Sequence, residues 1–239
     1  MVTGTMPSTI NPQSLGNSEM FGALGEAALT AVAAAGIVRR VVAGTTVFAQ
    51  GNPGVTCHGL IEGRVKIVQT QVNGSQSVLR FIGPGEMYGT VAAMMNKPFP
   101  ADAVAVVDSV EIVWSVAVMR QLIRDYPEIG INATAAAGGR LFELQGRMGD
   151  LTGERVEQRI ARALGRLAGQ AGRLTDEGLE IDFPVTRQDL AEMSGATLHT
   201  VSRTLAAWDQ RGVTGGSRRR IVVRDIKALT ALAEDDIDA

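Results

Sequence analysis

The sequence predicts an α+β fold in which an antiparallel β-roll is followed by a long helix and a C-terminal winged helix-turn-helix. Residues 37–118 contain short β-rich runs separated by glycine-bearing turns, whereas residues 119–167 carry apolar side chains at helical spacing. Val185–Leu205 then has a glycine between two helix-length segments, a pattern typical of a helix-turn-helix. The length of 239 residues suits one large domain or two small ones.

Residues 1–18 are rich in Ser, Thr, Gly, Pro and Asn and lack the basic and apolar regions of a signal peptide. We expect them to form a disordered lead-in. Apolar residues at helical spacing and a closing glycine predict a short helix over Phe21–Gly36. No charge-free apolar stretch approaches about 18 residues, so the sequence predicts no membrane-spanning segment.

Residues 19–118 are expected to form the β-roll, similar to a jelly roll, which would sense an effector. Glycine-bearing turns occur at Gly44, Gly63 and Asn73–Gly74, and the last is a strong signal for a β-hairpin. Many short strands at this spacing are typical of a sandwich, roll or barrel. The expected strands are Val41–Val42, Thr45–Phe48, Leu60–Ile61, Val65–Val68, Val78–Ile82 and Ala103–Val107.

Residues 119–151 hold two expected helices. Met119–Tyr126 is stopped by Pro127, and a longer helix runs from Glu128 through Gly149. Apolar residues at heptad spacing along the longer helix predict a homodimer packed through a helical seam. An amphipathic helix packed on its own domain is the alternative. The seam consists of Ala137, Leu141, Leu144, Met148 and Leu151.

Residues 152–239 form the last expected domain, in which positive charge is focused. Residues 197–224 contain six arginines and one acid, and residues 225–239 contain five acids and one lysine, in a chain of net charge −2. A focused basic patch favours polyanion binding, and a solvated charged face is the alternative. The expected elements are a helix at Arg155–Leu167, a linker at Gly169–Glu180, the helix-turn-helix, a β-hairpin wing at Gly212–Val223 and a short acidic tail.

The helix-turn-helix carries its own start and turn signals. Thr186 and Asp189 resemble a capping box that opens the first helix. Gly195 occupies the tight turn, where a positive φ is cheap only for glycine. Thr197 is suited to cap the second helix. Ala191 is small at the point where the two helices are expected to cross closely.

The second helix is expected to read DNA. Val201 and Leu205 face the core at i and i+4, which leaves Arg203 on the exposed face, where it can donate a bidentate hydrogen bond to guanine. Arginines at the tip of the wing can neutralise phosphates. The residues expected to contact DNA are Arg187, Gln188, Thr197, His199, Thr200, Ser202, Arg203, Arg218, Arg219 and Arg220.

Cysteine and histidine are scarce. Cys57 is the single cysteine, which excludes an internal disulfide framework and a four-thiolate zinc or iron–sulfur site within one chain, and favours a reducing cytoplasm. Two histidines leave little material for catalysis, and neither a Gly-rich phosphate loop nor a Gly-x-Ser-x-Gly elbow is present. We therefore expect no enzyme, no catalytic residue and no metal site.

Three local matches carry a resemblance to a known family. Gly74–Gly89 resembles the roll segment of the fumarate–nitrate regulators, Arg120–Pro127 the start of the dimerisation helix, and Thr186–Leu205 the DNA-binding motif. Over about residues 19–233 the sequence is similar to the CRP/FNR superfamily of transcription regulators. The resemblance implies a cyclic-nucleotide-binding-like roll, a homodimer that binds an inverted repeat in double-stranded DNA, RNA polymerase as a partner, and no membrane.

The sequence departs from the family at its ligand positions. Cyclic-nucleotide members place a glutamate after the glycine that corresponds to Gly89, and an Arg-Ser pair further on. Here Thr90, Pro100 and Ala101 stand at these positions, and Leu144 replaces a hydroxyl residue. Since arginine is the natural phosphate clamp, we expect no cyclic nucleotide and a more apolar pocket. The iron–sulfur branch needs four cysteines, so no such cluster is expected.

A haem b in the apolar pocket is one candidate, with His58 as its axial ligand because His199 lies on the DNA-reading helix. A partly exposed strand histidine is the alternative for His58. Cys57 is its neighbour and points to the opposite face of a regular strand, so the two cannot ligate one iron. A redox switch at Cys57 needs a lowered pKa, and a buried inert thiol is the alternative.

The recognition helix gives a finer resemblance. Most fumarate–nitrate-like members read DNA with a Glu-x-x-Ser-Arg pattern, whereas this chain has His199-x-x-Ser202-Arg203. That pattern is similar to the nitric-oxide-responsive NnrR-like subgroup, and it implies control of denitrification or nitric oxide response genes. The alternatives are a family member with a different effector, a constitutive DNA binder without one, or a Cys57 redox sensor.

Overall fold

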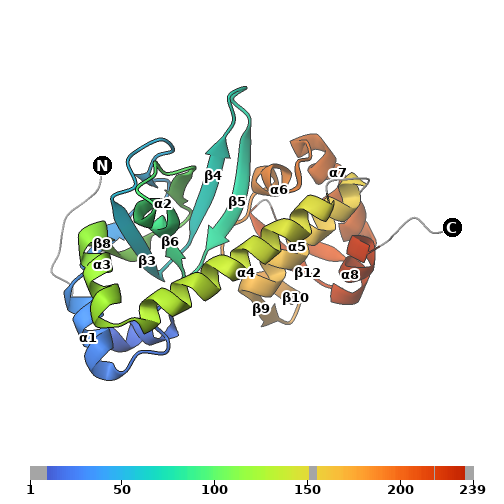
Figure 1. The fold of residues 1–239 in the computed structure, drawn as a ribbon. Helices are drawn as coiled ribbons and strands as arrows, with labels where there is room; N and C mark the ends of the chain where they lie inside the picture. The colour runs from blue at the N-terminus through green and yellow to red at the C-terminus, as the bar shows by residue number, and fades with distance from the viewer. Residues whose placement is uncertain (1–9, 151–154, 218, 235–239) are drawn as a thin grey trace. The chain divides into compact units, whose positions relative to one another are not determined.

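The computed structural model describes residues 10–150, 155–217 and 219–234, with the backbone alone for residues 143–150. The chain divides into two compact units. One contains Leu79–Gly146 and the described residues before Gln76, and the other contains Gln76–Val78 and the described residues after Gly146. Antiparallel sheets with flanking helices confirm the predicted α+β class (Figure 1). Within these described ranges, no helix is long and apolar enough to cross a membrane.

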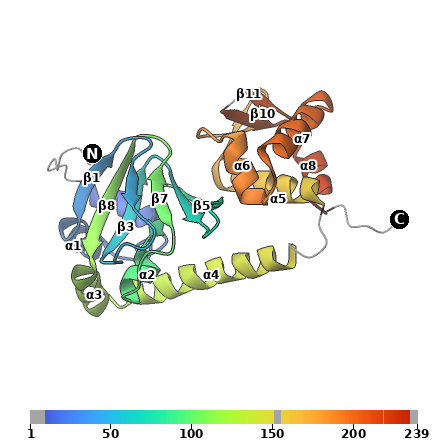
Figure 2. The ribbon, with the colours of Figure 1, turned by 90° about the horizontal axis from the view of Figure 1, so that it is seen from above.

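Two four-stranded antiparallel sheets form the β-roll of the first unit (Figure 2). Their strand orders are β1-β8-β3-β6 and β2-β7-β4-β5. Four of the six predicted strands are longer than expected, because charged and polar positions such as Arg39 and Thr56 belong to them. The strands expected at Thr45–Phe48 and Ala103–Val107 are each one residue shorter. The strands are β1 (Ile37–Val41), β2 (Thr46–Phe48), β3 (Thr56–Glu62), β4 (Val65–Thr70), β5 (Gln76–Ile82), β6 (Met87–Tyr88), β7 (Asp102–Ala105) and β8 (Ser109–Ser115).

Helical segments flank the roll. In both ribbon views α4 runs as one straight helix (Figures 1 and 2). Ser115 caps α3 by accepting a hydrogen bond from Val118 N at 3.2 Å, so this helix begins earlier than Met119. The segments are the 3-10 helix η1 (Pro12–Asn17), α1 (Glu26–Ala34), α2 (Thr90–Met94), α3 (Val116–Asp125) and α4 (Glu128–Asp150).

The start of the described chain differs from the expected disordered lead-in over residues 1–18. Pro12–Asn17 form a 3-10 helix, and the Asn11 side chain caps it by accepting a hydrogen bond from the next helical N–H group. Leu15 is 3% exposed and joins the core. Ile10 also packs against this core. Polar turn-forming residues separate these two apolar side chains, so composition alone indicated disorder. Residues 1–9 lie outside the described residues.

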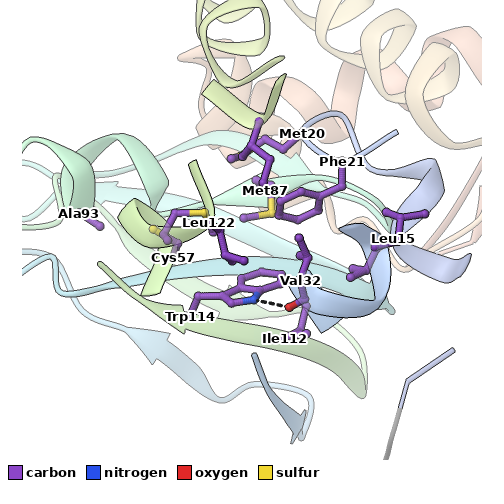
Figure 3. Close-up of a cluster of buried hydrophobic side chains, with 13 residues drawn as sticks. Leu15, Met20, Phe21, Val32, Cys57, Met87, Ala93, Ile112, Trp114 and Leu122 are labelled. Carbon is purple, nitrogen blue, oxygen red and sulfur yellow. Dashed lines mark hydrogen bonds between the residues drawn. The ribbon is translucent and has the colours of Figure 1, made fainter. Parts of the chain in front are cut away.

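The main apolar core of the first unit packs against the sheet that contains β3 and β8 (Figure 3). Trp114 is 1% exposed, and its Nε1 donates to the carbonyl oxygen of Val32 at 2.9 Å. The Phe21 ring lies 5.4 Å from the Trp114 ring. Phe21 was expected inside a helix, but α1 begins at Glu26 and leaves Phe21 to fill this core. Cys57 is buried in the same cluster.

The second unit contains helices and a four-stranded antiparallel sheet in the order β11-β12-β10-β9. Gly169–Glu180 was expected as a linker, but it holds the end of α5 and most of the β9–β10 hairpin. These strands have only four residues each, too few for a clear alternation in the sequence. The elements are α5 (Val156–Ala171), β9 (Gly172–Thr175), β10 (Gly178–Ile181), α6 (Arg187–Ser194), α7 (Leu198–Gln210), β11 (Thr214–Ser217), β12 (Arg220–Val223) and α8 (Ile226–Glu234).

Candidate nucleic-acid interface and effector cavity

The helix-turn-helix is fixed by local hydrogen bonds at its helix starts. Thr186 Oγ1 accepts a hydrogen bond from Asp189 N at 3.0 Å, and Asp189 Oδ2 accepts one from Thr186 N at 2.9 Å. Gly195 ends α6 with a φ of 63°, in the left-handed region that favours glycine. Thr197 Oγ1 accepts from Thr200 N at 3.1 Å and so caps α7. The predicted capping box, turn glycine and second cap are confirmed.

α7 has one buried and one exposed face. Val201, Leu205 and Trp208 are buried on the inner face. Trp208 Nε1 also donates to Glu157 Oε1 on α5 at 2.7 Å. The packing and this hydrogen bond hold α7 in a fixed rotation, and therefore fix which of its side chains point outward.

The outward face of α7 lies beside a groove between α6, α7 and the wing. His199 and Arg203 are exposed on this helix, as is Thr197 at its start, whereas Thr200 is half-buried. The groove has a volume of about 760 Å³. It brings four of the predicted DNA contacts together. The residues that line it are Thr186, Arg187, Gln188, Leu198, Ser202, Ser217 and Arg219.

The wing places one predicted DNA contact, Arg220, in ion pairs. Arg219 is exposed in the turn between β11 and β12, and Arg218 lies outside the described residues. Arg220 instead donates to Glu180 Oε2 at 3.0 Å and to both carboxylate oxygens of Glu177 at 3.2 Å. Hydrogen bonds to Glu180 and Glu177 raise the pKa of Arg220, and the bond to Arg220 lowers the pKa of Glu180. Its guanidinium is therefore held by the β9–β10 hairpin.

A cavity of about 400 Å³ lies in the β-roll unit. Thr90, Pro100 and Ala101, the residues that replace the nucleotide-binding pattern, line it, and the side chain of Leu144 lies outside the described residues. Most of the lining is apolar, as the sequence predicts. The full lining is Phe48, Ile67, Arg80, Ile82, Met87, Tyr88, Gly89, Thr90, Val91, Ala92, Met95, Lys97, Pro98, Phe99, Pro100, Ala101 and Arg140.

Basic residues at this cavity were missed by the sequence reasoning. Arg80 lies on β5 and Arg140 on α4, so both lie outside the stretch from Thr90 to Ala101 that corresponds to the nucleotide-binding pattern. Arg80 forms an ion pair with Glu86. Arg140 forms one with Glu19. The lining of the cavity is therefore mostly apolar and includes basic side chains.

A buried polar network adjoins the cavity around Glu111, which is 0% exposed. Its carboxylate accepts hydrogen bonds from His58 Nδ1 at 2.9 Å, Tyr88 Oη at 2.5 Å and Arg39 Nη2 at 2.7 Å. Burial acts to raise the pKa of Glu111, but the hydrogen bond and charge of His58, together with Arg39, lower it. Burial and the Glu111 charge raise the pKa of Tyr88. The network holds an ionised carboxylate inside the roll.

His58 does not fit an axial haem ligand. Its side chain is 2% exposed, so the expected partial exposure was wrong. Nδ1 donates to Glu111, and Nε2 lies 2.9 Å from Thr56 Oγ1, which leaves neither nitrogen open toward a cofactor. The ring also packs against the rings of Phe48 and Tyr88, with centroids 5.2 and 5.1 Å away. The histidine belongs to the structural network of Glu111.

Cys57 faces the opposite side of β3, as predicted for its neighbour position. Its side chain is 0% exposed in the apolar core (Figure 3). Burial raises the pKa of the Cys57 thiol to about 11. The thiol is therefore protonated at neutral pH, which favours the inert interpretation over the redox switch. Across the described part of the chain, no group of three or more His, Cys, Asp or Glu residues could hold a metal ion.

α4 exposes an apolar face. Ile131, Leu141 and Phe142 are 68%, 57% and 76% exposed. Leu141 belongs to the predicted seam, and Ala137 is half-buried. The remaining seam positions, Leu144, Met148 and Leu151, lie outside the side chains that the structure describes. Large apolar side chains at this exposure are typical of a surface covered by a partner.

Comparison with known families gives one match for each unit. Residues 38–126 match the model of the cyclic nucleotide-binding domain. Residues 158–232 match the model of the Crp-like helix-turn-helix domain.

Curated relatives match over most of their length. The chain is 30% identical over 190 residues to the cyclic AMP receptor protein of Thermus thermophilus, covering 80% of this chain and 85% of the relative. It is 27% identical over 190 residues to the CRP-like cAMP-activated global transcriptional regulator of Mycobacterium tuberculosis, with the same coverage. It is also 27% identical over 203 residues to the nitrogen fixation regulation protein FixK of Azorhizobium caulinodans, covering 84% of this chain and 81% of the relative.

Solved structures share the fold. The catabolite activator protein of Thermus thermophilus aligns with a TM-score of 0.54 and 27% identity, covering 91% of this chain and 99% of that one. FixK2 of Bradyrhizobium japonicum aligns with a TM-score of 0.73 over 85% of this chain and 98% of that one. At 20% identity, the second likeness concerns the fold alone.

Proposed function

The chain belongs to the CRP/FNR family of DNA-binding transcription regulators, and from that premise we propose that it binds an inverted-repeat operator as a homodimer. α7 reads the major groove, and an effector in the β-roll cavity controls the affinity. RNA polymerase is the partner through which bound protein changes transcription.

The observation that carries this proposal is the division of α7 into two faces. Its inner face is fixed by buried Val201, Leu205 and Trp208. His199 and Arg203 are therefore presented outward, beside the basic groove. A guanidinium on such a face can bind guanine O6 and N7 together, which is the commonest specific contact in the major groove.

The exposed apolar face of α4 supports the homodimer. Two copies that pack through Ile131, Leu141 and Phe142 would remove these side chains from water. A two-fold dimer presents two recognition helices to successive major grooves, about 34 Å apart on one face of DNA. The operator is then an inverted repeat.

The targets proposed are denitrification or nitric oxide response genes. The support is the His199-x-x-Ser202-Arg203 pattern on α7, with His199 exposed where most fumarate–nitrate-like members carry glutamate. A glutamate accepts from cytosine N4, whereas a neutral imidazole can donate or accept. The half-site therefore differs from that of the glutamate members at one base pair.

The effector proposed for the cavity is not a cyclic nucleotide. Thr90, Pro100 and Ala101 line the cavity where cyclic-nucleotide members carry a glutamate and an Arg-Ser pair. These residues supply no charged group for a cyclic phosphate.

In vitro selection of operators from random duplex DNA, with the purified full-length protein, tests the function. The expected product is an inverted repeat with half-sites one helical turn apart. Sedimentation of the complex then gives two protein chains per duplex. Selection of a single asymmetric half-site, or of no sequence at all, would contradict the proposal.

A further inference from the structure

The β-roll cavity combines an aromatic lining with charge of one sign. Arg80, Lys97 and Arg140 line it, and none of its lining residues is acidic. Phe48 and Phe99 stack with ring centroids 3.9 Å apart and an interplanar angle of 16°. A ligand with a flat apolar body and a negative group matches both properties.

Two glutamates that do not line the cavity form ion pairs with its two arginines. Glu86 pairs with Arg80, and Glu19 pairs with Arg140. Glu19 Oε1 also accepts a hydrogen bond from Met87 N at 3.1 Å. Arg140 Nη2 donates to the carbonyl oxygen of Met87 at 3.3 Å. Each of the two guanidinium groups is therefore already paired with a carboxylate of the protein.

Glu19 connects the segment before α1 to α4. A second contact runs beside it, because Asn132 Nδ2 on α4 donates to the carbonyl oxygen of Met20 at 3.1 Å. Arg140 belongs to the same helix as the exposed apolar residues Ile131 and Leu141. A ligand that replaces Glu19 as the partner of Arg140 removes the ion pair between this helix and the segment before α1.

We propose that the effector of this cavity is a small aromatic carboxylic acid, and that its carboxylate replaces Glu19 as the partner of Arg140. The proposal rests on the proposed function of the cavity as the effector site. The aromatic body packs on Phe48 and Phe99, and Arg80 adds positive charge to the site. Because Arg140 lies on α4, replacement of Glu19 by a ligand changes the contacts of α4 when the cavity is occupied. The exchange involves hydrogen bonds and charge only, so no covalent bond forms or breaks.

Isothermal titration of the full-length protein with 1-naphthoate and with its neutral analogue 1-naphthalenemethanol tests the ligand class. The acid is expected to bind about tenfold or more tightly than the alcohol. Arg140→Gln and Arg80→Gln each weaken binding of the acid about tenfold and leave the alcohol unchanged. Arg40→Gln, an exposed arginine of β1 outside the cavity, is the matched control and changes neither.

The Glu19→Gln variant tests whether the ligand carboxylate replaces Glu19 at Arg140 or whether Glu19 only supports the fold. Removal of the competing carboxylate is expected to tighten binding of 1-naphthoate about fivefold or more, whereas a Glu19 that only supports the fold would leave it unchanged or weaken it. Equal affinity for acid and alcohol, no binding of the acid, or tighter binding of cyclic AMP than of the acid would overturn the proposal. Binding of operator DNA by the protein without effector is measured in a separate experiment. Failure to bind DNA there would contradict the DNA-binding function but not the proposed class of ligand.

Discussion

The arginines of the helix-turn-helix and those of the β-roll cavity differ in what holds them. Arg187, Arg203 and Arg219 are exposed, and no ion pair joins them to an acid within the described ranges. Arg80 and Arg140 line the cavity, and each is paired with a glutamate. An unpaired surface guanidinium attracts any nearby phosphate, whereas a paired one is released only by a ligand that replaces its partner. The unpaired arginines of the helix-turn-helix are suited to attract DNA at all times. The paired arginines of the cavity are suited to exchange a glutamate for a ligand.

The largest expected effect concerns the roll, where a carboxylate is buried with its partners. Glu111→Ala leaves the buried His58 and Tyr88 without their acceptor. The free energy of unfolding is expected to fall by about 3–5 kcal/mol, measured by urea denaturation. Glu62→Ala removes an exposed glutamate of β3 and is expected to change this free energy by less than about 0.5 kcal/mol. Equal effects of the two substitutions would refute the network.

The same carboxylate predicts a pH dependence. The pKa of Glu111 in the folded protein lies below its ordinary value of 4.5. Its contribution to stability is therefore complete above pH 4.5 and is lost as the pH falls through the folded-state pKa. Glu111→Gln is expected to flatten the loss of stability in acid, measured by urea denaturation across that range. An unchanged acid slope would show that other carboxylates carry it.

The next effect concerns the exposed face of α4. Leu141→Glu places like charges opposite each other across the two-fold axis of the proposed homodimer. The dimer dissociation constant is expected to rise roughly tenfold or more, measured by sedimentation equilibrium. Ala117→Glu adds the same charge to an exposed position of α3 and is expected to leave the dimer intact. A dissociation constant that Leu141→Glu leaves unchanged would show that the dimer interface lies elsewhere.

A smaller effect is expected at the start of α7. Thr197→Ala removes the side-chain acceptor of the Thr200 N–H group, which costs about 1 kcal/mol of stability. Thermal unfolding of the full-length protein measures it. Thr230→Ala, at an exposed position inside α8, is expected to cost less than about 0.5 kcal/mol. If the two variants unfold alike, the cap does not set the position of α7.

The smallest effect separates two neighbouring arginines of the wing. Arg219→Ala is expected to reduce the slope of log affinity against log salt by about one, because one phosphate contact is lost. Arg220→Ala is expected to leave the slope unchanged, because Glu177 and Glu180 hold that guanidinium. Fluorescence anisotropy with operator duplex between low and moderate salt measures both. If Arg220→Ala changes the salt slope more than Arg219→Ala does, Arg220 contacts DNA phosphate.

The helix-turn-helix was predictable from the sequence because its determinants are local. Thr186 and Asp189 are three residues apart and hydrogen bond to each other, and Gly195 adopts its positive φ within one turn. Burial of Val201 and Leu205 then follows from their spacing along the helix. A short window of sequence contains each of these interactions entirely.

The cavity was less predictable because its charged residues come from distant segments. Arg140 and its partner Glu19 are 121 positions apart, and nothing near either residue indicates the pairing. The ion pairs of Arg220 were not predicted for a related reason, since the four-residue strands β9 and β10 that position its partners were not recognised. The burial of His58 was not predicted either, because its partner Glu111 stands 53 positions away.

The affinity of the Arg203→Ala variant for a selected operator tests the central claim most directly. Fluorescence anisotropy is expected to show a loss of about 1–3 kcal/mol of binding free energy, together with loss of preference for guanine at one position in each half-site. Arg211→Ala changes an exposed arginine at the end of α7 and is expected to keep both the affinity and the preference. An Arg203→Ala protein that binds the same operator with unchanged affinity and base preference would contradict the assignment of α7 as the DNA-reading helix.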